Sequence, residues 1–202
     1  MRQVVSHQLE DFAAIYEEDV ELVSVARAQA SDCETAAKRL VDTRQVPQLR
    51  WIQAANDPEA ADSALPAAVE ADVRAMLVSQ IAEAGHLLGE LMGCERVGIR
   101  LETLSAPMCP RFHVDYVPCR LLITLSGAGT EWIANSDVDW TVFSDLDTAA
   151  PPVQPDRQIR QMSTGAWSLL KGGAWSEQFD GIVHRSPHGT GERLLLSLDP
   201  IV

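Results

Sequence analysis

Two residues that can bind a metal ion stand two positions apart in a short alternating stretch of the chain. His113 and Asp115 are separated by Val114 and flanked by Phe112 and Tyr116. In a β-strand, side chains two positions apart point to the same face, roughly 6–7 Å from each other along it. The pattern therefore predicts a strand that projects an imidazole and a carboxylate into one cavity, where they could share a divalent ion.

A second histidine completes a ligand set. His184 lies much later in the chain, in the segment GIVHRSP. Two histidines and one carboxylate form the facial triad of non-haem iron sites, which leaves positions open for a co-substrate and dioxygen. We therefore predict that His113, Asp115 and His184 bind one metal ion. Iron(II), zinc and manganese all suit these ligands, so the residues alone do not choose among them.

An arginine near the second histidine suggests a second ligand. Arg193 begins the apolar run that follows His184, beyond turn-forming residues around His188 and Gly189. A hairpin with its turn at those two residues would place Arg193 opposite His184, with Cβ atoms roughly 5 Å apart. Its planar guanidinium could then bind the far carboxylate of a small dicarboxylate whose other end binds the metal.

Other ligand sets stay open at this stage. The four cysteines are Cys33, Cys94, Cys109 and Cys119. Cys109 and Cys119 lie on either side of His113, so these three could form a zinc site, although their spacing matches no zinc finger or ribbon. His188 could add a ligand, and Glu131 could be an acid behind the ligands. A structural protein without a metal is a third interpretation.

Composition limits the classes of function. The chain has 202 residues, of which 46% are hydrophobic and 22% charged, as in ordinary globular proteins. It shows no apolar run long enough to cross a membrane and no signal-peptide pattern at its start, so we expect a cytoplasmic protein. A net charge of −13 argues against nucleic acid and anionic membranes as partners. The sequence indicates neither the substrate nor the oligomeric state.

The first 93 residues are expected to be mainly helical and to support the rest. Helices are predicted at 9–16, 31–44 and 66–92, and a strand at 18–27. Ser31 and Glu34 have the spacing of a capping box, and Gly93 is a natural end for the last helix. The polar segment 56–66 is predicted to be a linker.

From residue 94 onward the pattern changes to short apolar runs separated by turns. The candidate strands lie at 96–104, 112–117, 120–127, 130–134, 140–143, 165–172, 181–186 and 193–199. We predict an α+β protein that forms a single domain over 1–202. In it, N-terminal helices pack on a cupin-like double-stranded β-helix, or jelly roll, that carries the metal site in 94–202. The long acidic and proline-containing segment 135–164 is predicted to be a mobile cover over the site.

The C-terminal sequence resembles a known superfamily. HVDYVPCRLLITL followed by GIVHRSPHGTGERLLLSLD resembles the double-stranded β-helix core of the iron(II)/2-oxoglutarate-dependent dioxygenases, notably the prolyl-hydroxylase-like branch. In that superfamily His-x-Asp and a distal histidine bind iron. The resemblance implies that His113, Asp115 and His184 bind iron(II).

The same resemblance implies a 2-oxoglutarate site. In the superfamily, a basic residue about nine or ten positions after the distal histidine binds this co-substrate, which points to Arg193. On the strand that follows the His-x-Asp motif, Arg120 and Thr124 share a parity and would face the same cavity. Some members carry a serine two positions after the arginine, whereas Ser197 lies four positions after Arg193.

A second resemblance extends over most of the chain. The segments CPRFHVD, GTEWI, GIVHRSP and RLLLSLD are similar to the bacterial family called domain of unknown function 1826. Members of that family tend to accompany zinc-responsive genes, which implies a tie to metal supply. The function we predict is a metal-dependent oxygenase of the iron(II)/2-oxoglutarate type. The alternative is a non-enzymatic, cupin-like metal-binding protein linked to zinc homeostasis.

Overall fold

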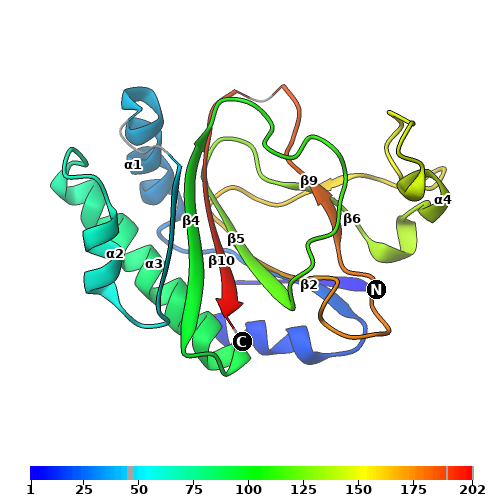
Figure 1. Cartoon of the computed structure of the whole chain (residues 1–202), viewed down its shortest axis with the longest axis horizontal. Coiled ribbons are helices and arrows are strands. Elements are labelled where there is room, and N and C mark those ends of the chain that lie inside the picture. The colour runs from blue at the N-terminus through cyan, green and yellow to red at the C-terminus, as the bar shows by residue number, and fades with distance from the viewer. Residues whose placement is uncertain (45–47, 190, 202) are drawn as a thin grey trace.

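A seven-stranded sheet forms the centre of the structure, a computed structural model that describes residues 1–44, 48–189 and 191–201. In spatial order its strands are β1 (Arg2–Ser6), β2 (Val20–Val25), β8 (Trp167–Lys171), β5 (Cys119–Ser126), β10 (Arg193–Ile201), β4 (Arg96–Leu104) and β3 (Leu49–Ala54). Neighbouring strands are antiparallel, apart from the parallel pair of β1 and β2. The N-terminal part of the chain therefore supplies strands at both edges of this sheet, in addition to its helices (Figure 1).

A smaller sheet faces the large one. Its strands, in spatial order, are β7 (Arg160–Gln161), β6 (Glu131–Ile133) and β9 (Val183–Arg185). A cluster of buried side chains fills the space between the sheets, with Leu122, Leu170 and Leu195 from the large sheet and Trp132 from the small one. Two facing sheets that share such an interior form the predicted jelly-roll arrangement.

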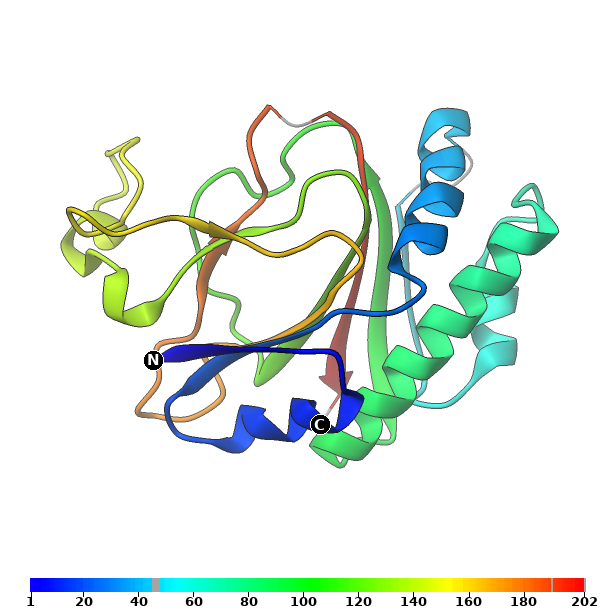
Figure 2. The same cartoon turned by 180° about the vertical axis from the view of Figure 1, so that it is seen from behind.

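Helices cover the other face of the large sheet. They are the 3₁₀-helix η1 (Leu9–Tyr16) and the α-helices α1 (Ala30–Thr43), α2 (Pro58–Ala64) and α3 (Ala71–Met92). Figure 2 shows these helices on one side of the large sheet and the small sheet on the other. Gly93 ends α3 with a left-handed φ of 63°, as predicted. None of the described helices combines the length and the apolar character needed to cross a bilayer.

Alternation along the strands assigns each residue to one of these two faces. On β10, Leu194, Leu196 and Leu198 are buried against the helices, together with residues of α1 and α3. Arg193 and Leu195 point the other way, toward the small sheet. Each aliphatic side chain buried on the helix side stabilises the fold by about 1.5–3 kcal/mol.

The segment 135–164 packs on the outer face of the small sheet. It contains the 3₁₀-helix η2 (Asn135–Asp137) and α4 (Trp140–Ser144), followed by a loop that leads to β7. Its apolar side chains join a cluster with residues of the small sheet: Phe112, Ile133, Val138, Val183, Phe143, Val153 and Ile159. The segment is therefore a packed outer layer, and the prediction of a cover over the site is wrong.

The α+β class and the helices packed on a β-jelly roll are confirmed, but several local predictions are wrong. Residues 140–143 form most of α4 instead of a strand, because Asp139 accepts hydrogen bonds from the backbone N–H groups of Thr141 and Val142. The predicted linker 56–66 contains α2, whose N-cap is Asp57 and whose first residue is Pro58.

Other differences concern boundaries and strands. α1 begins at Ala30, with Gln29 at its N-cap and no side-chain capping bond, so the predicted capping box is not formed. β1, β3 and β7 were not predicted; β1 and β3 form the two edges of the large sheet, and β7 has only two residues. The predicted strand 112–117 is reduced to one isolated bridge between His113 and His184, since the chain turns away at Tyr116.

Candidate metal site

The backbone places the two histidines opposite each other. His184 lies on β9, and the amide N–H of each histidine donates to the carbonyl oxygen of the other at 3.0 Å. Asp115 follows two residues after His113. One ligand atom from each of the three side chains lies within 4.8 Å of the others, as the spacing of the first two residues predicts.

Hydrogen bonds of the Nδ1 atoms orient the two imidazole rings. The Nδ1 atom of His113 lies 3.0 Å from the carbonyl oxygen of Arg111, and that of His184 lies 3.0 Å from the carbonyl oxygen of Ile182. A carbonyl oxygen can only accept, so each Nδ1 donates its hydrogen. The Nε2 atom of each ring therefore faces Asp115, and it is the nitrogen available to bind a metal.

Asp115 is held as an anion between the histidines. Its two carboxylate oxygens lie 3.6 Å from Nε2 of His113 and 3.1 Å from Nε2 of His184. Burial alone would raise the pKa of Asp115, but hydrogen bonds with both histidines and the charge of Arg120 hold it well below its usual range. The hydrogen bond with Asp115 raises the pKa of His113. The carboxylate is thus ionised and available as a ligand at neutral pH.

Arg120 is occupied by two carboxylates. Its Nε and Nη2 atoms donate to the two oxygens of Asp199 at 2.6 and 2.7 Å, and Nη1 donates to Asp115. We expected Arg120 to face the co-substrate, and it does point into the interior. Its donors, however, orient the Asp115 carboxylate, which is the role of a residue just behind a metal ligand.

Two glycines fix the backbone that carries Asp115. The N–H of Gly173 donates to the carbonyl oxygen of Asp115 at 2.9 Å. A Cβ atom on Gly172 would lie 2.0 Å from the carbonyl oxygen of Val117, which is far closer than van der Waals contact allows. The sequence Lys-Gly-Gly, which is typical of a turn, here allows the close approach of two chain segments.

Arg193 is buried deep in the same interior. Its side chain is 3% exposed, and its Nη2 donates to the hydroxyl oxygens of Thr124 at 3.4 Å and Thr130 at 3.2 Å. Among the described residues, Nε and Nη1 have no hydrogen-bond partner. Burial lowers the pKa of Arg193 to about 10, so it is charged at neutral pH. A buried guanidinium without a carboxylate is costly, and such a group is typical of a site for an anion.

The sequence predicted Thr124, but not Thr130, as part of the co-substrate site. Thr130 precedes β6, so it reaches Arg193 from the opposite sheet. The predicted hairpin is not formed, because His184 and Arg193 lie on strands of different sheets. The predicted turn at His188 and Gly189 is followed by Thr190, which lies outside the described residues.

The alternative ligands lie elsewhere. Cys119 is fully buried on the helix side of the large sheet, and burial raises its pKa to about 12, so the zinc site with Cys109 and His113 is not formed. His188 is exposed and lines a different hollow, with Phe112 and Arg185 among its other residues. Glu131 accepts a hydrogen bond from Arg185 at 2.7 Å instead of contacting the triad.

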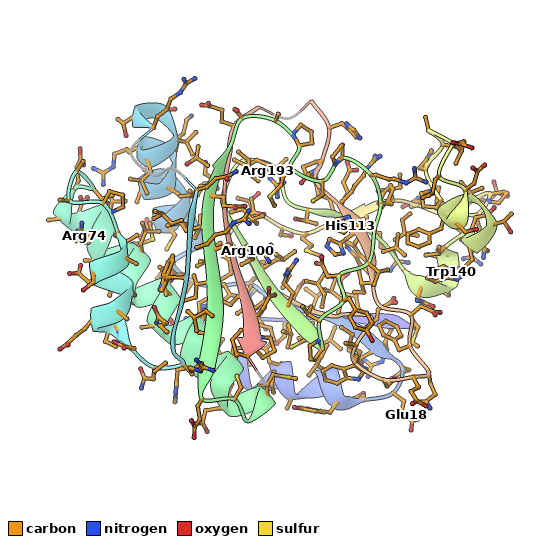
Figure 3. All side chains as sticks on the ribbon, viewed as in Figure 1. Glu18, Arg74, Arg100, His113, Trp140 and Arg193 are labelled. Atoms are coloured by element: carbon orange, nitrogen blue, oxygen red, sulfur yellow. The ribbon has the colours of Figure 1, made fainter. Side chains whose placement is uncertain are left out.

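A cavity of about 310 Å³ opens onto the triad. Its wall includes His113, Asp115, His184 and four arginines: Arg50, Arg100, Arg120 and Arg185. Thr130 and Leu195 continue the wall toward Arg193. No residue of the segment 135–164 belongs to this wall. In Figure 3, Arg100 and Arg193 lie on the side of the large sheet and His113 lies across from them.

Comparisons with known proteins agree with this fold. A dioxygenase for auxin oxidation from rice aligns over 100% of this chain and 83% of its own, with 13% identity and a TM-score of 0.60. Dioxygenase for auxin oxidation 1 from Arabidopsis thaliana, in a binary complex with 2-oxoglutarate, aligns over 100% and 92%, with 10% identity and a TM-score of 0.58. A prolyl-4-hydroxylase from Pseudomonas putida aligns over 96% and 93%, with 12% identity and a TM-score of 0.51.

Sequence comparison adds the family. A search of curated protein sequences finds no significant match. One family model, in contrast, matches residues 6–199, which is nearly the whole chain. The match covers the triad, Arg193 and the two threonines beside it, and it agrees with the resemblance expected from the motifs around His113 and His184. The chain therefore belongs to the family described as "Protein of unknown function (DUF1826)".

Proposed function

We propose that this protein is a metal-dependent oxygenase of the iron(II)/2-oxoglutarate type. The observation that carries the proposal is the combination, in one interior, of a His-Asp-His triad and a buried guanidinium whose Nε and Nη1 have no partner among the described residues. A metal ion and a dicarboxylate would satisfy both features together. The structural neighbours support the proposal, since they are two dioxygenases and a prolyl-4-hydroxylase, one of them in complex with 2-oxoglutarate.

The donor set fits iron(II). His113, Asp115 and His184 supply two imidazole nitrogens and one carboxylate. The Nε2 atoms of His113 and His184 lie 3.6 and 3.1 Å, respectively, from the carboxylate of Asp115. Two ligands at about 2.1 Å from a shared ion lie roughly 3 Å apart when they are adjacent, so small rotations suffice. Three protein ligands leave positions open for a chelating co-substrate.

The region around Arg193 fits the far carboxylate of 2-oxoglutarate. Among the described residues, Nε and Nη1 have no partner, and each shares an edge of the guanidinium with Nη2 that can bind a carboxylate through two hydrogen bonds. The hydroxyls of Thr124 and Thr130 accept from Nη2 and hold the guanidinium in place. The dicarboxylate would thus extend from the triad toward Arg193, with its keto-acid end at the metal.

Bound iron(II) and 2-oxoglutarate would supply the redox chemistry. One oxygen atom of dioxygen would enter succinate as 2-oxoglutarate loses CO₂, and the other would enter the substrate. The protein contributes orientation and enclosure. Arg120 and Asp199 fix the Asp115 carboxylate, and the carbonyl oxygens of Arg111 and Ile182 fix the two imidazoles. Arg193 sets the direction of the co-substrate, and the sheets around it exclude water.

Titration of 2-oxoglutarate into the iron-loaded, oxygen-free protein tests the proposal. A charge-assisted bidentate contact contributes about 1.5–3 kcal/mol, so Arg193→Gln should weaken 2-oxoglutarate binding roughly ten- to a hundredfold. Iron affinity should be unchanged, because Arg193 is not a ligand. Arg193→Lys should give an intermediate result, since it keeps the charge and loses the fork.

Arg96→Gln is the matched control. Arg96 is exposed on β4, and its loss should leave 2-oxoglutarate binding unaltered. Failure of the wild-type protein to bind 2-oxoglutarate would refute the oxygenase proposal and favour a metal-binding protein without this activity. The comparisons give no support to a link between such a protein and zinc homeostasis.

A further inference from the structure

The arginines around the cavity carry information about the substrate. We infer that the molecule oxidised at this site is a small acid and that Arg100 binds its oxyanion group, a carboxylate or a phosphate. This inference rests on the proposed oxygenase function and adds the class of substrate. Arg100 lies on β4, on the face of the large sheet that points toward the triad, and it lines the cavity.

The charge of the cavity wall is opposite to that of the protein. The chain carries a net charge of −13. The residues around the cavity nevertheless include four arginines and one carboxylate, Asp115. Arginine is the side chain best suited to binding carboxylate and phosphate, through its planar set of donors. An acidic protein that lines its cavity with arginine has a wall suited to anions.

Three of these arginines already have a carboxylate partner. Arg50 donates to Glu102, Arg120 to Asp199 and Arg185 to Glu131, at distances between 2.6 and 3.0 Å. The guanidinium of Arg185 also lies over the ring of Phe112, 4.3 Å from its centroid. These contacts neutralise the three arginines and fix their positions. None of the three is available as the main anchor for a further anion.

Arg100 is the exception. Among the described residues, its one ion pair joins Nη2 to an oxygen of Asp199 at 3.9 Å, which is beyond hydrogen-bond distance. Both oxygens of Asp199 already accept hydrogen bonds from Arg120. The side chain of Arg100 is 38% exposed, so its guanidinium borders the open part of the cavity. Its charge is therefore the least compensated of the four.

The strand register adds a repulsive neighbour to the poorly compensated charge of Arg100. Arg100 stands directly opposite Arg50 on β3, and like charges at opposed positions repel. Arg50 turns toward Glu102, which relieves part of the repulsion but leaves Arg100 without that carboxylate. An oxyanion bound at Arg100 would remove what remains. The repulsion between Arg50 and Arg100 thus favours the protein with an oxyanion bound over the protein without one.

Arg100 and Arg193 lie at different levels of the same sheet face. Arg100 is opposite Ser197 on β10, and Arg193 lies four residues before Ser197, or roughly 13 Å along the strand. Figure 3 shows the two arginines at separate heights, with His113 across from them. One interior can therefore bind two anions, the co-substrate at Arg193 and a second acid at Arg100.

The volume of the cavity limits the size of that acid. At about 310 Å³ it lies at the lower end of the range for ligand sites, roughly 300–1,000 Å³. The co-substrate would occupy part of this volume. The remainder fits a small acid, whose oxyanion at Arg100 directs the rest of the molecule toward the triad.

Pairs of acidic and neutral probes test the inference. Benzoate is compared with benzamide, and phenyl phosphate with its neutral dimethyl ester, on protein loaded with manganese(II) and saturated with 2-oxoglutarate in the absence of oxygen. Manganese(II) broadens the NMR signals of probe protons close to the triad, so it reports both affinity and position. We expect at least one acid to bind about tenfold tighter than its neutral partner, and the acid preferred identifies carboxylate or phosphate.

Substitutions assign the preference to a residue. Arg100→Gln should weaken the acid about ten- to a hundredfold and leave the neutral probe unchanged. Arg96→Gln removes an arginine from the same strand outside the cavity and should change neither. The inference is overturned if acids and neutral probes bind alike, if the preference survives Arg100→Gln, or if no acid binds near manganese(II).

The titration of 2-oxoglutarate separates this inference from the oxygenase proposal. Arg100→Gln should bind 2-oxoglutarate as the wild type does, whereas Arg193→Gln should not. If the wild type fails to bind 2-oxoglutarate, the oxygenase proposal fails. The probe pairs are then compared on the manganese(II) protein alone, where an acid preference that depends on Arg100 and not on Arg193 still supports an anion site at Arg100.

Discussion

The two faces of the large sheet are formed by alternate residues of the same strands, yet they differ in almost every physical respect. Along β10, Leu194, Leu196 and Leu198 are buried and aliphatic on the side of the helices. On the opposite side, Arg193 and Ser197 are buried and polar. The strand pattern is the same, but one face meets apolar helices, whereas the other borders both an apolar cluster that includes Leu195 and the cavity at the triad.

This difference shows which face stabilises the fold and which face carries the site. Burying a leucine side chain contributes about 1.5–3 kcal/mol, and leaving a buried polar group without a partner costs about 1–3 kcal/mol. One leucine on the helix face thus offsets roughly one buried polar group without a partner, such as Nε or Nη1 of Arg193 within the described part of the chain. The inner face can keep costly polar groups because the helix face supplies the stability.

The largest effect is expected on the helix face. Leu196→Ala removes a side chain with no exposed surface and leaves a cavity, which should lower the free energy of unfolding by about 2–5 kcal/mol. The affinity of the folded protein for iron(II) should stay the same. Denaturant unfolding and metal titration measure the two quantities. An equal loss in both would show that the two faces are not independent.

The next effect concerns the inner face. Asp115→Asn replaces a charged ligand with a neutral one and should weaken metal binding roughly a hundredfold or more, because even residues behind a ligand contribute ten- to a hundredfold. Circular dichroism of the metal-free variant should match that of the wild type, since the helix face is untouched. Unchanged metal content after dialysis would contradict the assignment of Asp115 as a ligand.

A smaller effect should follow from moving the loop that carries Asp115. Gly172→Ala places a Cβ atom 2.0 Å from the carbonyl oxygen of Val117 and forces this segment away from Gly172. We expect metal affinity to fall on the order of tenfold, because the carboxylate moves while remaining charged. Ser176→Ala, a few residues further along the chain, serves as the control. Retention of full metal affinity by Gly172→Ala would show that the loop can adjust.

The smallest effect is expected from Glu21, which lies at a bulge in β2. The pairing of β1 with β2 skips Glu21, which is fully buried and accepts a hydrogen bond from the backbone N–H of Asn135 at 2.9 Å. Burial raises the pKa of Glu21 above 4.5, so between 4.5 and the raised value the folded state binds more protons than the unfolded state. Stability should therefore fall as the pH rises through this range.

Glu21→Gln keeps an acceptor for Asn135 and removes the buried charge. This substitution should raise the free energy of unfolding at neutral pH. It should also reduce the decrease of that free energy as the pH rises above 4.5, as measured by denaturant unfolding at several pH values. An unaltered pH dependence would mean that other groups produce the decline.

Short-range patterns were sufficient for much of the fold and for the triad. The spacing of His113 and Asp115 places both side chains on one side of the backbone, whether the segment is a strand or a single bridge. Helical periodicity and Gly93 indicated α3, and short apolar runs separated by turns indicated β4, β5 and β10. Two capping signals were also present in the sequence, Asp57 before Pro58 and Asp139 before Trp140, and both begin helices that we did not predict.

The tertiary structure alone decided which residues meet across the interior. Spacing along a strand is a local property, whereas the pairing of strands depends on how the whole chain closes. His184 and Arg193 were predicted to share a hairpin, but the chain passes from one sheet to the other between them. Thr130 thereby reaches Arg193 from the facing sheet, and Arg100 comes to lie opposite Arg50. The sequence by itself determined the residues that could bind a metal, and the closure of the two sheets determined the arginines that surround them.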